Sequence, residues 1–134
     1  MLKKATDFLC YWFPIILYCL LIFFQSAKPS PESLPDILYL DKLLHFSAYA
    51  LLGALFLRAF RTLPIKKNPM LILSLSMLLS TLYGFSDELH QYFVPARQAD
   101  VMDALADMLG SAAGVWAYHK TLGNPRSVLA RILD

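Results

Sequence analysis

Residues 84–114 read GFSDELHQYFVPARQADVMDALADMLGSAAG, and this stretch decides how the chain folds. It holds five of the ten carboxylates of the sequence, yet long apolar segments flank it on both sides. On a helix that turns about 100° per residue, Asp100, Asp103, Asp107, Gly110 and Gly114 fall within about 80° of one another. Carboxylates are costly in hydrocarbon, so this stripe must face protein, water, an ion or a ligand.

Composition places the chain among membrane proteins. It has 134 residues, enough for one domain, of which 57% are apolar and only 16% are charged, and its mean hydropathy is +0.50. A net charge of +2, spread along the chain, is too small for a nucleic-acid-binding surface. We therefore expect the lipid bilayer to be a partner and no nucleic acid to be one.

The first apolar segment, at about 8–25, is uncharged for long enough to span ~27 Å as a helix. It carries Pro14 in its second turn, where a kink is tolerable in a membrane helix. No small-x-small cleavage site follows, so we interpret the segment as a retained transmembrane helix rather than a signal peptide.

Three more apolar segments predict helices at about 41–60, 69–92 and 100–119. A proline-rich loop at 26–40, with room for one short turn, joins the first two helices, and a basic loop at 61–68 joins the next two. The predicted fold is an all-α, integral membrane four-helix bundle. It forms a single domain of residues 1–122, followed by a short basic cytoplasmic tail at 123–134.

The basic residues predict the orientation in the membrane. Four spans place both termini on one side, and the side that carries more Lys and Arg is normally cytoplasmic. Three of the twelve basic residues, Lys28, Lys42 and Arg97, lie on the side away from the termini. The other nine are Lys3, Lys4, Arg58, Arg61, Lys66, Lys67, Lys120, Arg126 and Arg131. Both termini are thus predicted to be cytoplasmic, and the acidic stretch is predicted to open outward.

Polar residues from three helices are predicted to meet in one pocket recessed from the outer surface. Asp103 lies ~4–5 Å and Asp107 ~10 Å deeper than Asp100 along the fourth helix. Glu88 and His45 each lie about one turn inside the ends of their own helices. A central Asp costs about 2.5–3.5 kcal/mol on insertion scales, so these carboxylates need partners. The candidate cations are Lys42, His45 and Arg97.

Structural roles could explain part of this set without any ligand. Asp100 and Asp41 could cap their helices, which the helix dipole favours. Arg97 could pin its loop through an ion pair, or hold the phosphate of a lipid or substrate. Glu88 with Gln91 could lock the third helix to the fourth through a hydrogen bond.

Several chemistries fit the cluster. A divalent metal would take neutral His45 and carboxylates of Glu88, Asp103 and Asp107, although the sequence has neither an HExxH nor a paired-cysteine motif. A general acid–base site would need a carboxyl with a raised pKa, which suits a recessed Glu88 or Asp107. The candidate catalytic residues are His45, Glu88 and Asp103. An ion or proton path is a third option, but four short helices leave little room for alternating access.

The second half of the fourth helix carries small residues at a spacing that favours close helix packing. Ala106, Gly110 and Gly114 follow one another at intervals of four. This contact could lie within one chain, or could form a homo-oligomer through Gly110 and Gly114.

Two segments resemble the VanZ-like family of small bacterial membrane proteins: DKLLHFSAYALLG at 41–53 and SDELHQYFVPARQADVMDALADMLGSAAG at 86–114. The family often has Gly where this chain has Ala96, and Asn where it has Asp107. The pattern carries onto Asp41, Lys42, His45, Glu88, Gln91, Arg97, Asp100, Asp103 and Gly110.

The resemblance implies a multi-pass protein of a bacterial inner (plasma) membrane. The family's namesake is associated with low-level resistance to the glycopeptide teicoplanin, without the usual change of peptidoglycan precursor. We favour a non-enzymatic envelope protein whose outer pocket binds a polar headgroup, a lipid-linked precursor or the drug. The expected binding residues are Asp41, Lys42, His45, Glu88, Gln91, Arg97, Asp100, Asp103 and Asp107. The alternative is a membrane-embedded enzyme, metal-dependent or acid–base, that acts on a lipid-linked headgroup.

Overall fold

The computed structural model describes residues 2–28 and 39–122, and all regular structure in these two ranges is helical. The helices are α1 (Leu2–Tyr11), α2 (Phe13–Ser26), α3 (Leu40–Phe60), the short 3₁₀ helix η1 (Pro64–Lys67), α4 (Pro69–Tyr92) and α5 (Val101–Leu122). The predicted all-α class is confirmed. Most of the predicted 26–40 loop and the predicted tail at 123–134 lie outside the described residues.

The helix boundaries agree closely with the sequence for α3 and α4. The α4 bounds are those predicted, because Asn68 caps its first turn by accepting a hydrogen bond from the Leu71 N–H at 3.2 Å. The fourth predicted helix was placed one residue too early and ended three residues too soon. Its predicted first residue, Asp100, is instead the cap: its side chain accepts the Met102 N–H at 2.8 Å. The basic loop also contains η1, which was not predicted.

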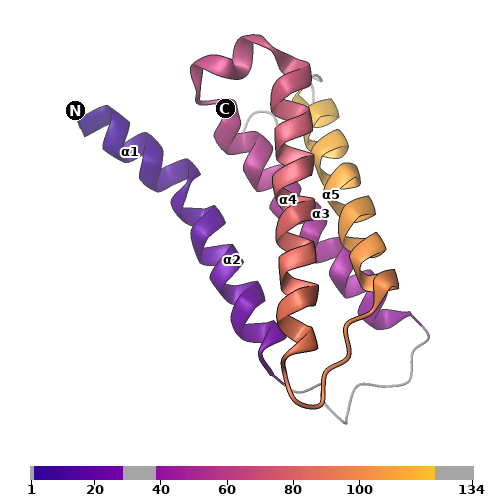
Figure 1. Ribbon diagram of the computed structural model, residues 1–134. Helices are drawn as coiled ribbons and strands as arrows, with labels where there is room; N and C mark the ends of the chain where they lie inside the picture. The colour runs from indigo at the N-terminus through magenta and orange to yellow at the C-terminus, as the bar shows by residue number, and fades with distance from the viewer. Residues whose placement is uncertain (1, 29–38, 123–134) are drawn as a thin grey trace.

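Three helices form the packed core, and the N-terminal pair leans away from them (Figure 1). The helices α3 and α5 run side by side in the same direction, and α4 runs the opposite way beside them. Of the most apolar 18-residue window of Ala5–Ser26, only 6% is buried within the molecule, against 33% for Leu40–Phe60. The predicted four-helix bundle is therefore observed only in part, as a three-helix core with an arm.

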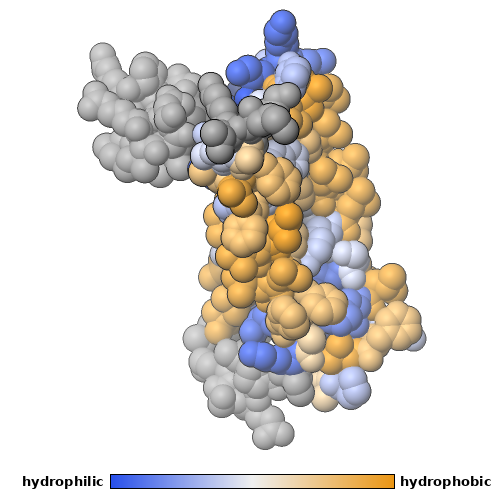
Figure 2. All heavy atoms as spheres, turned by 90° about the vertical axis from the view of Figure 1, so that its left-hand side faces the viewer, coloured by the Kyte–Doolittle hydropathy of each residue, from blue (hydrophilic) through white to orange (hydrophobic). Residues whose placement is uncertain are grey.

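Within residues 2–28 and 39–122, three segments are long and apolar enough to cross a membrane: Ala5–Ser26, Leu40–Phe60 and Pro69–Tyr92. Helix α5 was predicted as a fourth span and is not among them. Its first two turns carry Asp103 and Asp107, which lower its hydropathy, although its length of 22 residues would suffice. Figure 2 shows that the face on the side of the arm is largely apolar, with hydrophilic residues at its upper end and in its lower half.

The helix predicted at about 8–25 is instead two helices, α1 and α2, divided near the Pro14 at which a kink was judged tolerable. The helix breaks at Trp12, and Pro14 lies in the first turn of α2. Proline has no N–H to donate to the carbonyl of Cys10, four residues earlier. Arg58 of α3 supplies the missing donor, because its Nη1 lies 3.0 Å from that carbonyl oxygen. The Arg58 guanidinium also lies 4.5 Å from the centre of the Tyr11 ring, so one side chain fixes the arm to the core.

Backbone contact between α3 and α5 depends on two glycines. A Cβ added to Gly110 would collide with the carbonyl of Phe46, and one added to Gly114 would collide with the carbonyl of Ala50. This confirms the predicted close packing and locates it within one chain. Because α3 covers both glycines, a contact between copies of the chain would have to use another face. Homo-oligomerisation stays a prediction, and its interface would not include Gly110 or Gly114 while α3 covers them.

The first testable consequence concerns Gly114. We expect Gly114→Ala to separate α5 from α3 and to destabilise the folded protein by on the order of 3 kcal/mol, because backbone atoms cannot move aside as a side chain can. Thermal unfolding of the detergent-solubilised protein measures this. Ala117→Val is the matched control, since Ala117 is exposed on the same helix. Equal melting temperatures for the two variants would contradict the assignment.

A double-mutant cycle tests the contact between Arg58 and the carbonyl freed by Pro14. Arg58→Met should cost about 1–2 kcal/mol of folding free energy in the natural chain, because a carbonyl in an apolar setting loses its donor. In a Pro14→Ala background the new N–H can satisfy that carbonyl, so the cost of Arg58→Met should fall by about 1 kcal/mol. Strictly additive effects in equilibrium unfolding would argue against this contact.

Candidate functional site

The predicted polar residues gather at one end of the three-helix core. The first turns of α3 contribute Asp41, Lys42 and His45, and the last turns of α4 contribute Asp87, Glu88 and Gln91. Asp103 and Asp107 follow in the first turns of α5, with Asp100 before them. These helix ends coincide in space because α3 and α5 start where α4 finishes (Figure 1). We call this set of nine residues the polar cluster.

Lys42 binds the carboxylates nearest the end of the cluster. Its Nζ lies 2.9 Å from Asp41 Oδ2, 2.6 Å from Asp100 Oδ2 and 2.6 Å from Asp103 Oδ1. The Lys42 ammonium, together with the Met102 N–H, holds the pKa of Asp100 below its ordinary value. One lysine therefore fixes the start of α5 to the start of α3 through two of its three ion pairs.

His45 lies one turn deeper and faces three other carboxylates. Its Nδ1 is 2.9 Å from Asp107 Oδ1 and 3.9 Å from Glu88 Oε1, and its Nε2 is 3.8 Å from Asp103 Oδ2. The imidazole thus lies between carboxylates of α4 and α5. All four residues proposed from the sequence as metal ligands or acid–base groups are brought together here.

The link between α4 and α5 is held by Glu88 and Arg97. Glu88 Oε2 accepts the backbone N–H of Asp100 at 3.1 Å, so Glu88 locks α4 to α5 as expected, although not together with Gln91. Arg97 Nη2 donates to the amide Oε1 of Gln91 at 2.7 Å, so it pins the loop through an amide and not through the expected carboxylate. Ala96 has φ 64°, in the left-handed region that favours glycine, which explains physically why Gly would suit this position.

Gln91 connects the cluster to the arm. Its Nε2 donates to Asp87 Oδ2 at 3.2 Å and to Ser26 Oγ, at the end of α2, at 3.3 Å. Ser26 was missed by the sequence analysis, which assigned it to a loop. The only signal was a small polar residue directly after an apolar run, and that signal is weak because loops also begin this way.

Exposure falls steadily from the end of the helices inward. The exposed fraction of the side chain is 57% for Asp41, 42% for Asp100, 10% for Asp103 and 1% for Asp107. The cluster therefore has a wet rim and a dry interior. This gradient agrees with the predicted depth order, since each turn of α5 carries a carboxylate further from the surface.

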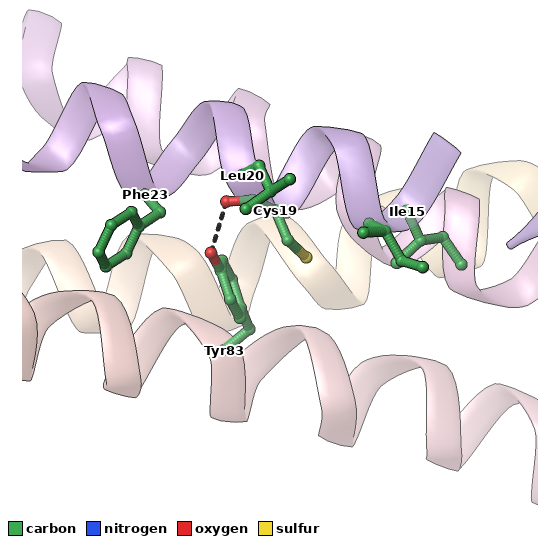
Figure 3. Close-up of a pocket in the computed structure, with 6 residues that line it drawn as sticks. Ile15, Cys19, Leu20, Phe23 and Tyr83 are labelled. Carbon is green, nitrogen blue, oxygen red and sulfur yellow. Dashed lines mark hydrogen bonds between the residues drawn. The ribbon is translucent and has the colours of Figure 1, made fainter. Parts of the chain in front are cut away.

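Two cavities lie away from the cluster. One of about 420 Å³ lies between α2 and α4, lined by Ile15, Ile16, Cys19, Leu20, Phe23 and Tyr83 (Figure 3). There the Tyr83 hydroxyl donates to the Cys19 carbonyl at 2.6 Å, which leaves an almost wholly apolar lining. The other, of about 250 Å³, lies toward the opposite end of the core and includes Arg61, Lys66 and His119. A pocket at the polar cluster itself stays a prediction.

Comparison with known proteins identifies a family. A model of the VanZ/LLP1 family matches residues 8–123, which is most of the chain and includes the whole polar cluster. No curated protein and no solved structure matches the sequence.

Lys42→Met tests the ion pairs of the rim. The substitution leaves Asp103 nearly buried and without its cation, so we expect a loss of folding free energy on the order of 2 kcal/mol or more. Adding Asp103→Asn should recover part of that loss, because it removes the unpaired charge. Chemical unfolding in detergent gives both values. Lys66→Met, at an exposed lysine of η1, is the control and should change little; a similar loss there would contradict a special role for Lys42.

Proposed function

Because the chain belongs to the VanZ/LLP1 family, we propose that it is a non-enzymatic membrane protein of the bacterial cell envelope that binds a cationic headgroup at the polar cluster. The ligand is the headgroup of a lipid-linked envelope precursor or of a glycopeptide held at the membrane surface. The carboxylates of the rim, Asp41 and Asp100, meet it first.

A charge imbalance is the observation that carries this proposal. Six carboxylates belong to the cluster: Asp41, Asp87, Glu88, Asp100, Asp103 and Asp107. The cations beside them are Lys42, Arg97, which is bonded to the Gln91 amide, and His45 when it is protonated. Even with all three counted as charged, negative charge is in excess. Uncompensated charge near hydrocarbon is costly, so the cluster favours a positively charged ligand.

The distribution of basic residues supports an outward-facing cluster. Arg58, Arg61, Lys66 and Lys67 lie near the α3–α4 connection, at the end of the molecule opposite the cluster. The positive-inside rule assigns that end to the cytoplasm. The cluster then opens on the outer surface of the plasma membrane, where precursors and glycopeptides occur.

The apolar cavity supports a ligand that carries a hydrocarbon chain. Tyr83 lines that cavity, and Asp87 lies one turn further along α4, in the polar cluster. An amphiphile could place its chain between α2 and α4 and its headgroup beside the carboxylates.

An enzyme is the second candidate, and one contact favours it. The 2.9 Å distance between His45 Nδ1 and Asp107 Oδ1, in a nearly dry interior, is an arrangement that can hold or move a proton. Beside it Glu88 lies in reach of the same imidazole. Turnover of a lipid-linked substrate by the purified protein, lost in His45→Gln, would favour this candidate over simple binding.

A drug-sensitivity assay tests the binding proposal. In a bacterial host where the intact protein raises the inhibitory concentration of teicoplanin, Glu88→Ala and Asp103→Ala should each remove that protection, because each deletes a carboxylate of the cluster. Ser86→Ala is the control, since Ser86 is exposed on α4 and bonds within its own helix. Immunoblots of membrane fractions must show equal amounts of each variant. Undiminished protection by both acidic-site variants would refute the proposal.

A further inference from the structure

We propose that His45, Glu88 and Asp107 form a binding site for one divalent transition-metal ion, of the Zn²⁺ class, in the dry interior of the polar cluster. This site goes beyond headgroup binding at the rim and does not depend on it. Each of the three helices of the core contributes one ligand: His45 from α3, Glu88 from α4 and Asp107 from α5.

The ligand atoms are already close together. One ring nitrogen of His45, one carboxylate oxygen of Glu88 and one of Asp107 all lie within 4.8 Å of one another. Around a tetrahedral Zn²⁺ with bonds near 2.0 Å, ligand atoms lie about 3.3 Å apart. The observed 2.9 Å from Nδ1 to Asp107 Oδ1 and 3.9 Å from Nδ1 to Glu88 Oε1 lie on either side of that value. Small side-chain rotations would therefore suffice.

Buried oxygens without a hydrogen-bond partner provide independent support for a cation site. The Glu88 side chain is 9% exposed and that of Asp107 is 1% exposed. Glu88 Oε1, which faces His45, and Asp107 Oδ2 accept no hydrogen bond from any residue that the structure describes. Buried carboxylate oxygens are normally paired or bound to a metal. A metal ion between them would provide the partner that the protein does not.

The surroundings of His45 suit a metal ligand. Histidine ligands usually present their second ring nitrogen to a carboxylate, which fixes the ring and its tautomer. Here Nε2 faces Asp103 Oδ2 at 3.8 Å, and Lys42 holds the other oxygen of Asp103. Asp103 was expected from the sequence as a possible ligand, and the geometry makes it a positioning residue instead.

Charge and ligand type select the ion. Two carboxylates and a neutral imidazole around a divalent ion give a site with no net charge, which suits a dry interior beside hydrocarbon. A mixed set of one nitrogen and two oxygens fits Zn²⁺ better than Ca²⁺ or Mg²⁺, which prefer oxygen ligands only. A large headgroup could not reach Asp107, whose side chain is 1% exposed, whereas a bare ion needs far less room.

Metal binding by the purified protein tests the site. The detergent-solubilised protein is stripped with a chelator and titrated with Zn²⁺ alone, with no lipid or drug present, so the result is independent of the proposed function. We expect one Zn²⁺ per chain. Glu88→Gln and Asp107→Asn, which preserve side-chain shape, should each weaken binding at least about tenfold. Asp7→Asn is the matched control, because Asp7 is a carboxylate of α1 outside the polar cluster, and it should leave the affinity unchanged.

X-ray absorption at the zinc edge of the unaltered protein provides a second, variant-free measurement. We expect one imidazole nitrogen and carboxylate oxygens at about 2.0–2.2 Å. The site is refuted if the stripped protein binds no Zn²⁺ in stoichiometric amount, or if Glu88→Gln and Asp107→Asn bind it as tightly as the natural chain. Sulfur in the first coordination shell, from Cys10 or Cys19, would refute it equally. Should either variant fail to fold, the absorption spectrum alone decides.

Discussion

The close approach of α5 to α3 is the constraint on which the rest of the structure depends. Gly110 lies against the carbonyl of Phe46, and Gly114, one turn later, lies against that of Ala50. These two contacts fix the register between the two helices. Because the helices run in the same direction, this register also fixes what meets near their first turns: Lys42 comes beside Asp103, and His45 comes beside Asp107. A side chain at either glycine would collide with the α3 backbone, push α5 away from α3 and so separate these pairs.

That register gathers six carboxyl groups beside three basic side chains, those of Lys42, His45 and Arg97. A soluble protein could leave such carboxylates in water, but here the helices on both sides are apolar enough to lie in a membrane. The partners of these carboxylates differ with their depth in the cluster. At the rim, Lys42 pairs with the exposed carboxylates of Asp41 and Asp100. In the interior, His45 is the basic side chain that faces Glu88 and Asp107 among the residues that the structure describes. A large cationic ligand and a small cation would therefore act at different levels of the same cluster.

The sequence predicted the helices better than it predicted their arrangement. Apolar run length placed α4 at about 69–92, where the structure has it, and periodicity alone put Asp103 and Asp107 on one face. The arm could not be foreseen, because an apolar helix that packs against neighbours and one that faces lipid have the same composition. For the same reason, α5 was predicted to be a fourth membrane span. The structure shows that α5 packs extensively against α3 and is not among the candidate spans.

Within the cluster, residue types were predicted correctly but partners were not. A charged or ionisable side chain on an inward helix face needs a polar partner. The sequence therefore sufficed to name Lys42, His45, Glu88, Asp103 and Asp107. Which of these groups pair with one another depends on small differences in how each helix is rotated about its own axis. Arg97 therefore donates a hydrogen bond to the amide oxygen of Gln91 and not to a carboxylate. Gln91 in turn donates to the hydroxyl of Ser26, at the end of α2. Uncharged polar residues such as Ser26 carry no comparable signal, since they are tolerated in loops and helix ends alike.

The position of the arm follows from a few polar contacts in apolar surroundings. Arg58 holds its kinked half, and Gln91 holds its far end through Ser26. Between them, the hydroxyls of Tyr18 and Tyr83 bond to backbone carbonyls of Ala48 and Cys19. With no water to compete inside a membrane, such bonds are hard to exchange, so they set the spacing of α2 from α4 more firmly than the sparse apolar packing does. The cavity of Figure 3 is the space that this spacing leaves. Its width is therefore linked, through Gln91 and Asp87, to the same polar cluster that α3 and α5 assemble.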